Sequence, residues 1–130
     1  MIIAGIGARA RATSGDLVAA VREACARSGI EVSEVGQLSG LDRAQTVAAL
    51  RDAASQLNVA AVVWTTSALR MEAARCVTQS EASVAATDVP SIAEAAALAA
   101  AGPDGMLILP RIALATVTVA LAVGPGAPGS

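Results

Sequence analysis

Two glycines and two arginines occupy alternate positions directly after the first apolar residues of the chain. Met1–Ala4 is typical of a buried strand, which we expect to break at Gly5 into a loop that contains Gly7, Arg9 and Arg11. Glycine lets a backbone approach a ligand closely, and a guanidinium can hold a carboxylate or a phosphate through paired hydrogen bonds. The segment therefore predicts an anion-binding site.

A helix start follows this loop and adds a second feature that favours anions. Thr13 precedes Asp16 by three residues, the spacing of a capping pair, and Ser14 opens the helix. The free N–H groups of a helix N-terminus attract negative charge. We expect Arg9, Thr13 and Ser14 to lie around one cleft at the end of the first strand. The alternative, a tight turn with solvated arginines, stays open, because the glycine spacing is not GxGxxG.

Further candidates lie at other predicted helix starts and turns. Arg43 begins the second helix and Arg111 lies in a connection between two strands, so each is either a ligand contact or a surface residue. Ser91 and Glu94 have the spacing of a capping box, yet a helix start can also contact a ligand. Asp42 and Glu94 are the only candidates for a catalytic acid or base, and both have a structural explanation.

The absence of two residue types excludes several chemistries. The chain has no histidine, and all nine basic residues are arginine. Histidine general bases, Ser-His triads, lysine Schiff bases and the lysine-containing P-loop are therefore excluded. Cys25 and Cys76 are too few for a structural zinc site, and we expect neither a metal nor a cofactor.

Composition predicts one folded domain. The 130 residues are 55% hydrophobic and 15% charged, so we assign residues 1–123 to a single domain and 124–130 to a flexible tail. A net charge of −2 argues against nucleic acid as a partner. No apolar run reaches the roughly 18 residues of a membrane span. We expect a cytoplasmic protein without a signal peptide.

The hydrophobic pattern alternates between helices and strands. The segment 32–38 is expected to be an edge strand, and 59–64 a strand buried on both faces. Asp42 is the expected N-cap of the second helix, and 75–89 is expected to be irregular. Together the elements predict a three-layer α/β/α fold with a mixed sheet of about five strands. The predicted elements are helices over 14–28, 42–57, 65–74 and 91–102, and strands over 1–4, 32–38, 59–64, 106–109 and 116–123.

Five segments stand out in order along the whole chain: Gly5–Arg9 with its Thr/Ser helix start, Leu41–Arg43, Thr78–Glu81, Val89–Leu98 and Thr116–Ala120. Together they resemble the CobE/CbiG C-terminal family of cobalamin-biosynthesis proteins. CbiG opens the lactone of cobalt-precorrin-5A. The chain departs from the family's usual pattern at Ala8 and Ala10, and Arg43 and Arg111 stand where lysines are common.

The resemblance implies a role in corrin-ring assembly, with a carboxylate-rich tetrapyrrole intermediate near the ring-contraction stage as the ligand. Other enzymes of the pathway are possible partners. It leaves open whether the chain catalyses a reaction, since the N-terminal portion of CbiG has no counterpart here. Two other functions also stay open: a general binding module for anionic small molecules, and a non-catalytic partner of another pathway enzyme. The expected contact residues are Gly5, Gly7, Arg9, Arg11, Thr13, Ser14, Arg43, Ser91, Glu94 and Arg111.

Overall fold

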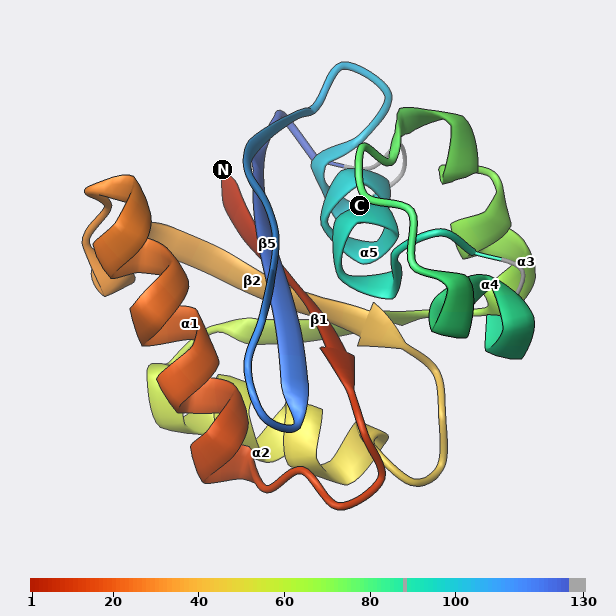
Figure 1. Cartoon of the computed structure of the whole chain (residues 1–130). Coiled ribbons are helices and arrows are strands. Elements are labelled where there is room, and N and C mark those ends of the chain that lie inside the picture. The colour runs from red at the N-terminus through yellow and green to blue at the C-terminus, as the bar shows by residue number, and fades with distance from the viewer. Residues whose placement is uncertain (88, 127–130) are drawn as a thin grey trace.

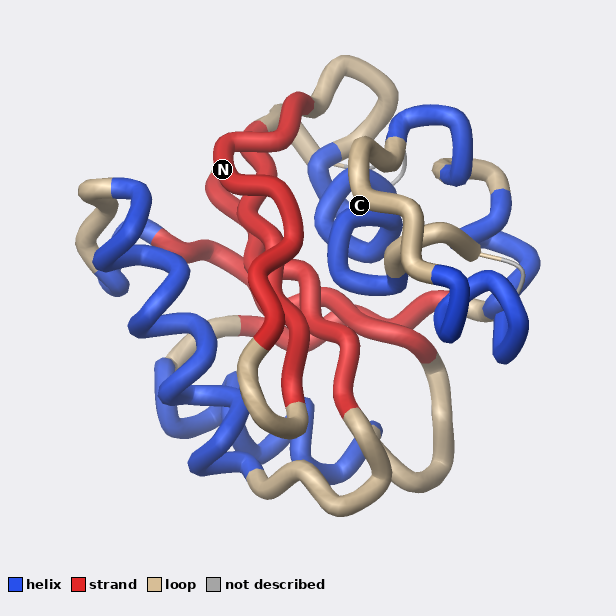
Figure 2. Tube along the Cα trace, in the orientation of Figure 1, coloured by secondary structure: helices blue, strands red, loops and turns tan. Residues whose placement is uncertain are grey.

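A twisted mixed sheet forms the middle of the molecule, between two layers of helices (Figures 1 and 2). The structure is a computed structural model that describes residues 1–87 and 89–126. The three-layer α/β fold is confirmed. Within the described residues the sheet has five strands: β1 (Ile2–Ala8), β2 (Val35–Leu41), β3 (Ala60–Trp64), β4 (Met106–Ala113) and β5 (Val117–Val123).

The helices divide between the two faces of the sheet (Figure 1). Helices α1 and α2 pack against one face, and α5 packs against the other, with α3 and α4 outside it. Two short 3-10 turns lie at Val32–Glu34 and Ala73–Arg75. The helices are α1 (Ser14–Ser28), α2 (Val47–Leu57), α3 (Thr66–Arg70), α4 (Glu81–Thr87) and α5 (Ile92–Ala101).

The strand order is β3-β2-β1-β5-β4, and it decides which chain segments meet. Strands β1, β2 and β3 are parallel, whereas β5 is antiparallel to both β1 and β4. The carboxyl ends of β1 and β2 therefore lie at the same end of the sheet as the turn between β4 and β5. One hydrogen bond joins them there, since the Arg9 N–H donates to the Thr116 carbonyl at 2.9 Å.

Two strand assignments from the sequence were wrong. The segment expected at the edge forms β2, which lies between β1 and β3. The run expected to be buried on both faces forms β3, an edge strand in which no residue is fully buried. An apolar run shows that both faces meet apolar neighbours, but it does not show which strands pair beside it.

The first helix agrees with the prediction, and the second begins later than predicted. Helix α1 spans the predicted 14–28, and Gly29 ends it in the left-handed conformation (φ 68°). Asp42 is not the N-cap of α2, which begins at Val47 after a turn. Thr46 Oγ1 points back and donates to the Arg43 carbonyl. Helix α4 lies within the stretch that was expected to be irregular.

Close packing of α5 on β1 explains Gly5 in the strand and the alanines of the helix. The strand continues through Gly5 and Gly7 to Ala8, so the predicted break at Gly5 was wrong. A Cβ on Gly5 would collide with the Ala93 carbonyl and lie 2.7 Å from the Ala97 Cβ. Gly5 therefore lets the helix approach the sheet, rather than opening a loop, and a Cβ on Gly7 would instead meet the Thr118 hydroxyl of β5.

Strand β4 is longer than predicted and contains a bulge. It continues through Pro110 and Arg111, which had been placed in the connection. Leu109 pairs with Leu121 and Ile112 with Val119, so β4 has one extra residue between these pairs. Proline lacks an N–H group and is tolerated in an edge strand such as β4.

The end of the described chain is tied to the domain. Gly124 donates its N–H to the Met1 carbonyl at 3.1 Å, and Gly126 donates to the Ala101 carbonyl at 3.0 Å. Residues 127–130 of the predicted tail lie outside the described residues. Among the helices that the structure describes, none is long and apolar enough to span a membrane.

Candidate functional site

A cleft of about 380 Å³ lies at the carboxyl ends of β1 and β2, and three arginines from distant parts of the chain line it. Arg9 follows β1, Arg43 follows β2, and Arg111 belongs to the bulged part of β4. We call this the arginine cleft. Crevices outside the carboxyl ends of parallel strands are the usual ligand sites of open α/β sheets.

A shallow depression continues the cleft outward. It is lined by Ala8, Arg9, Ala10, Arg11 and Arg43, so Arg11 joins the same positively charged region. Arg9, Arg11 and Arg43 are exposed, and Arg111 is partly buried. Guanidinium groups are charged at any physiological pH and have no acceptor atom. The region is therefore suited to a ligand with more than one carboxylate or phosphate group.

Hydroxyl groups line the inner part of the cleft. Ser91 Oγ accepts the Glu94 N–H at 3.2 Å as the N-cap of α5, and Thr118 Oγ1 donates to the Gly7 carbonyl at 3.3 Å. Of these hydroxyl residues, Ser91 was predicted as a contact from the sequence, whereas Ser80, Thr87, Thr116 and Thr118 were not. The lining residues besides the arginines are Gly7, Ala8, Ser80, Thr87, Ser91, Ile92, Ala113, Leu114, Thr116, Val117 and Thr118.

The helix start that borders the cleft is that of α5, whereas Thr13 and Ser14 of α1 are not among the lining residues. Thr13 and Asp16 form a complete capping box, with hydrogen bonds of 3.0 and 3.1 Å. The Thr13 N–H and the Thr116 hydroxyl lower the pKa of the Asp16 carboxyl. Ser14 Oγ accepts from the Gln56 amide. The N-terminus of α1 thus already has a carboxylate from its own chain, which disfavours a second anion.

Of the remaining predicted contact residues, Gly7 lines the cleft and Gly5 lies under α5. Asp42 is exposed after β2, where its N–H donates to the Trp64 carbonyl at 2.8 Å. The structure thus brings together Gly7, Arg9, Arg11, Arg43, Ser91 and Arg111.

Glu94 is fully buried behind the cleft, and its carboxylate accepts four hydrogen bonds. Oε1 accepts the Val77 and Thr78 N–H groups at 2.8 and 3.0 Å. Oε2 accepts the Thr78 hydroxyl at 2.6 Å and the Arg111 N–H at 2.9 Å. Burial by itself raises the pKa of Glu94, but these hydrogen bonds outweigh it, and the pKa lies below its ordinary value. The carboxylate therefore does not return to the backbone of Ser91 as a capping box would require.

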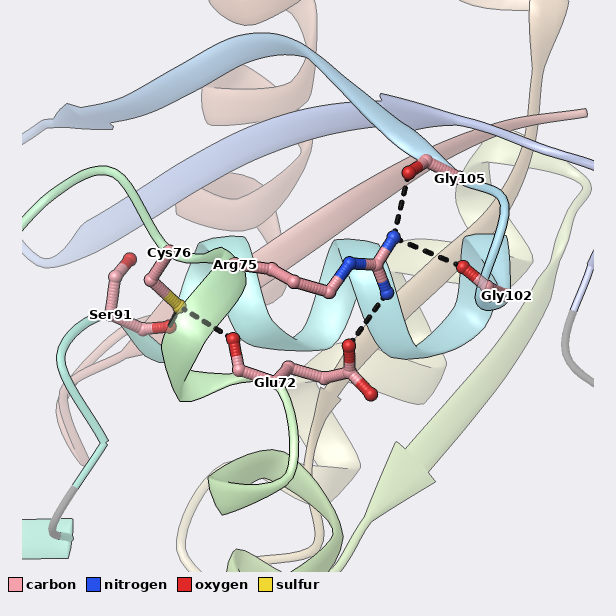
Figure 3. Close-up of polar contacts among 6 residues, drawn as sticks. All are labelled: Glu72, Arg75, Cys76, Ser91, Gly102 and Gly105. Carbon is pink, nitrogen blue, oxygen red and sulfur yellow. Dashed lines mark hydrogen bonds and ion pairs between the residues drawn. The ribbon is translucent and has the colours of Figure 1, made fainter.

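The segment 72–78 runs along α5 and is attached near both ends of that helix (Figure 3). Arg75 donates to the Gly102 and Gly105 carbonyls at 3.2 and 2.6 Å and forms an ion pair with Glu72 at 2.7 Å. The sequence contained one signal for this, the spacing of three residues between Glu72 and Arg75.

Both cysteines are buried and free. The Cys76 thiol donates to the Glu72 and Ser91 carbonyls at 3.5 and 3.8 Å (Figure 3), and burial raises its pKa to about 11. Burial also raises the pKa of Cys25. A protonated, buried thiol is a poor nucleophile and a poor metal ligand. In the described part of the chain, no three His, Cys, Asp or Glu side chains are grouped so that they could hold a metal ion.

The sequence is similar to a family of cobalamin-synthesis proteins and to a curated relative. The family described as "Cobalamin synthesis G C-terminus" matches residues 2–122. Protein CobE of Sinorhizobium sp is 32% identical over 124 residues, which cover 95% of this chain and 80% of the relative.

Two solved structures share the fold. One is CobE, a protein from the cobalamin (vitamin B12) biosynthetic pathway, with a TM-score of 0.89 and 26% identity over 97% of this chain and 92% of that chain. The other is the cobalamin biosynthesis protein chiG of Agrobacterium tumefaciens, with a TM-score of 0.77 and 37% identity over 96% of this chain and 99% of that chain.

Proposed function

Because this chain belongs to the cobalamin synthesis G C-terminus family, and so has a role in cobalamin biosynthesis, we propose that it binds a corrin-ring intermediate of that pathway through the carboxylates of the ring's side chains. Corrin precursors carry several acetate and propionate chains around the ring. Arginine binds such carboxylates through paired, charge-assisted hydrogen bonds. The stage that we propose is near ring contraction.

The observation that carries this proposal is the meeting of Arg9, Arg43 and Arg111 at one cleft, although more than 100 positions separate the first from the last in the sequence. Pockets of roughly 300–1,000 Å³ enclose drug-sized molecules. A corrin ring with its side chains is larger than a typical drug molecule. A cleft of about 380 Å³ can therefore hold only one edge of the ring. Arg11, on the adjoining depression, lies where a second carboxylate of the same ligand can reach it.

Titration with hydrogenobyrinic acid, a corrin with free acetate and propionate chains, tests the proposal. Arg9→Ala and Arg111→Ala should each weaken binding by roughly ten- to a hundredfold, since a charge-assisted contact is worth about 1.5–3 kcal/mol. Arg22→Ala is the matched control, because Arg22 is exposed on α1 away from the cleft. Equal affinity in all three variants and the wild type would remove the cleft from the site.

The ligand's carboxylates separate this function from that of a general anion-binding module. A corrin in which the side chains are amidated should bind much more weakly than the acid, whereas inorganic pyrophosphate should not compete at comparable concentration. Competition by pyrophosphate together with weak corrin binding would favour the general module.

One observation favours a non-catalytic partner as the alternative function. Met71 is 80% exposed beside a groove of about 500 Å³, which Trp64, Ala68 and Pro103 also line. An exposed apolar groove is typical of a protein contact. Absence of corrin binding by the wild type, with co-purification of another pathway enzyme that Met71→Glu abolishes, would favour this function. A cytoplasmic location stays a prediction from the sequence.

A further inference from the structure

The bulge in β4 removes a backbone N–H group from the sheet at the position where an arginine faces the cleft. Between the pairs Leu109–Leu121 and Ile112–Val119, β4 has two residues where β5 has one. Those two are Pro110, which has no N–H, and Arg111. Bulges re-aim side chains and are common beside active sites. The Arg111 N–H donates at 2.9 Å to Glu94 Oε2 instead of to β5.

Glu94 joins this bulge to the segment on the far side of α5. Its other donors, Val77 and Thr78, lie two to three residues before Ser80, which lines the cleft. The Thr78 hydroxyl, at 2.6 Å, contacts the same Oε2 that accepts from Arg111. One buried carboxylate therefore fixes two segments of the cleft wall relative to the start of α5.

Glu94 itself is fully buried, and it is not among the residues that line the arginine cleft. Each oxygen already accepts two hydrogen bonds, so the carboxylate has its acceptor capacity filled by the protein. A role in direct contact with a ligand does not fit this environment, whereas a role through Arg111 does.

We propose that Glu94 is a positioning residue for the arginine cleft: its carboxylate holds the β4 bulge so that Arg111 faces the ligand. The proposal rests on the proposed function, because the property that it explains is the affinity for a carboxylate-bearing corrin. Glu94, which the sequence indicates as a capping partner, is then a determinant of ligand binding.

The chain offers a matched control at the other end of the same helix. Arg75 attaches the segment 72–78 to the last turn of α5 and the residues after it, through Gly102 and Gly105 (Figure 3). Like Glu94, it makes several partly buried hydrogen bonds between that segment and α5, but it does not line the cleft. Arg75→Gln should therefore destabilise the fold without moving Arg111.

The experiment compares wild type, Glu94→Gln and Arg75→Gln in hydrogenobyrinic acid titrations, with backbone amide hydrogen exchange on the same proteins without ligand. Glutamine preserves the size of the side chain but removes the charge and one of the two acceptor oxygens. In Glu94→Gln we expect about a tenfold loss of affinity, as for a misplaced charge-assisted contact. We also expect faster exchange at the Arg111 amide. Arg75→Gln should preserve both the affinity and the slow exchange at Arg111.

The outcomes separate this inference from the proposed function. Absence of binding by the wild type would overturn both. Binding by the wild type, with the same affinity in folded Glu94→Gln, would overturn the inference alone. An equal loss of affinity in Arg75→Gln would also overturn it, because the effect would then follow general destabilisation.

A milder variant preserves the test if Glu94→Gln does not fold. Thr78→Val removes one donor to Oε2 and leaves the carboxylate charged. We expect it to fold, to weaken binding severalfold and to speed exchange at Arg111. Wild-type affinity in folded Thr78→Val would contradict the positioning role.

Discussion

At the scale of single residues, the two signs of charge have different partners in this protein. Arg9, Arg11 and Arg43 are exposed around the cleft, whereas the Glu94 and Asp16 carboxylates accept backbone N–H groups of their own chain. Satisfying an acid internally costs little when backbone donors are already in place. The arginines around the cleft are exposed to a ligand, which explains how a chain of net charge −2 can have a cationic cleft.

The lowered pKa of Glu94 makes a pH-dependent contribution to stability. The charged form is the one that folding favours, so the contribution is complete above the ordinary value of 4.5 and is lost as pH falls through the lower folded pKa. At neutral pH, Glu94→Gln should be about 1.5–3 kcal/mol less stable than the wild type, the range for hydrogen bonds to a charged group. Below pH 4 this difference should shrink, because a protonated glutamate resembles glutamine.

Urea denaturation of both proteins at pH 7 and at pH 3 measures this prediction. A difference between the two proteins that is as large at pH 3 as at pH 7 would mean that the charge of Glu94 does not stabilise the fold.

At the scale of elements, α5 combines low side-chain volume with complete burial. Every residue from Ala93 to Ala101 is buried, between the sheet on one side and the segment with α3 and Cys76 on the other. Ser39 Oγ in β2 donates to the Ala96 carbonyl at 2.7 Å, and Trp64 Nε1 donates to the same hydroxyl at 2.9 Å. Small side chains let the helix axis approach the sheet closely, which places its first turn at the cleft.

Two glycine-to-alanine changes should have opposite effects on stability. Gly5→Ala adds a methyl group where the Ala93 carbonyl and the Ala97 Cβ already lie, and overpacking of this kind costs about 1–3 kcal/mol or more. Gly15→Ala lies in the first turn of α1, where the nearest atom is 3.6 Å away. It should stabilise the protein by about 0.4–1 kcal/mol.

Thermal or urea unfolding of the two variants measures both values. If Gly5→Ala had wild-type stability, α5 would not pack on β1 as closely as described.

At the scale of the whole molecule, binding should depend on the local field of the cleft more than on net charge. The overall charge of −2 slightly repels a polyanionic corrin, and the exposed arginines attract it at short range. Salt reduces interactions between exposed charges, since the screening length falls from about 30 Å at 0.01 M to about 10 Å at 0.1 M.

We expect the affinity for hydrogenobyrinic acid to fall severalfold between these two salt concentrations in the wild type. The fall should be smaller in Arg11→Ala, which lacks one exposed guanidinium of the depression. An affinity that rises with salt would show that repulsion by the net charge exceeds the attraction of the cleft.

Local sequence patterns determined much of the secondary structure. The Thr13–Asp16 box and Gly29 define the ends of α1, and Ser91 and Gly102 define those of α5. These predictions succeeded because capping and left-handed glycine are properties of a few consecutive residues. The resemblance, carried by segments along the whole chain, likewise predicted the family that the comparison confirms.

The tertiary structure decided which contacts those residues make. The glycines of the first strand suggested an anion-binding loop, but they belong to β1, and Gly5 is where α5, almost 90 positions later, packs against that strand. Glu94 looked like half of a capping box, but its partners are Val77, Thr78 and the amide freed by a bulge at Arg111. The cleft was predicted at the start of α1, whereas in the structure it lies at the start of α5, for the same reason. Strand order and helix packing bring together groups that no local pattern connects, because pairing between distant segments depends on the burial and hydrogen bonding of the whole fold.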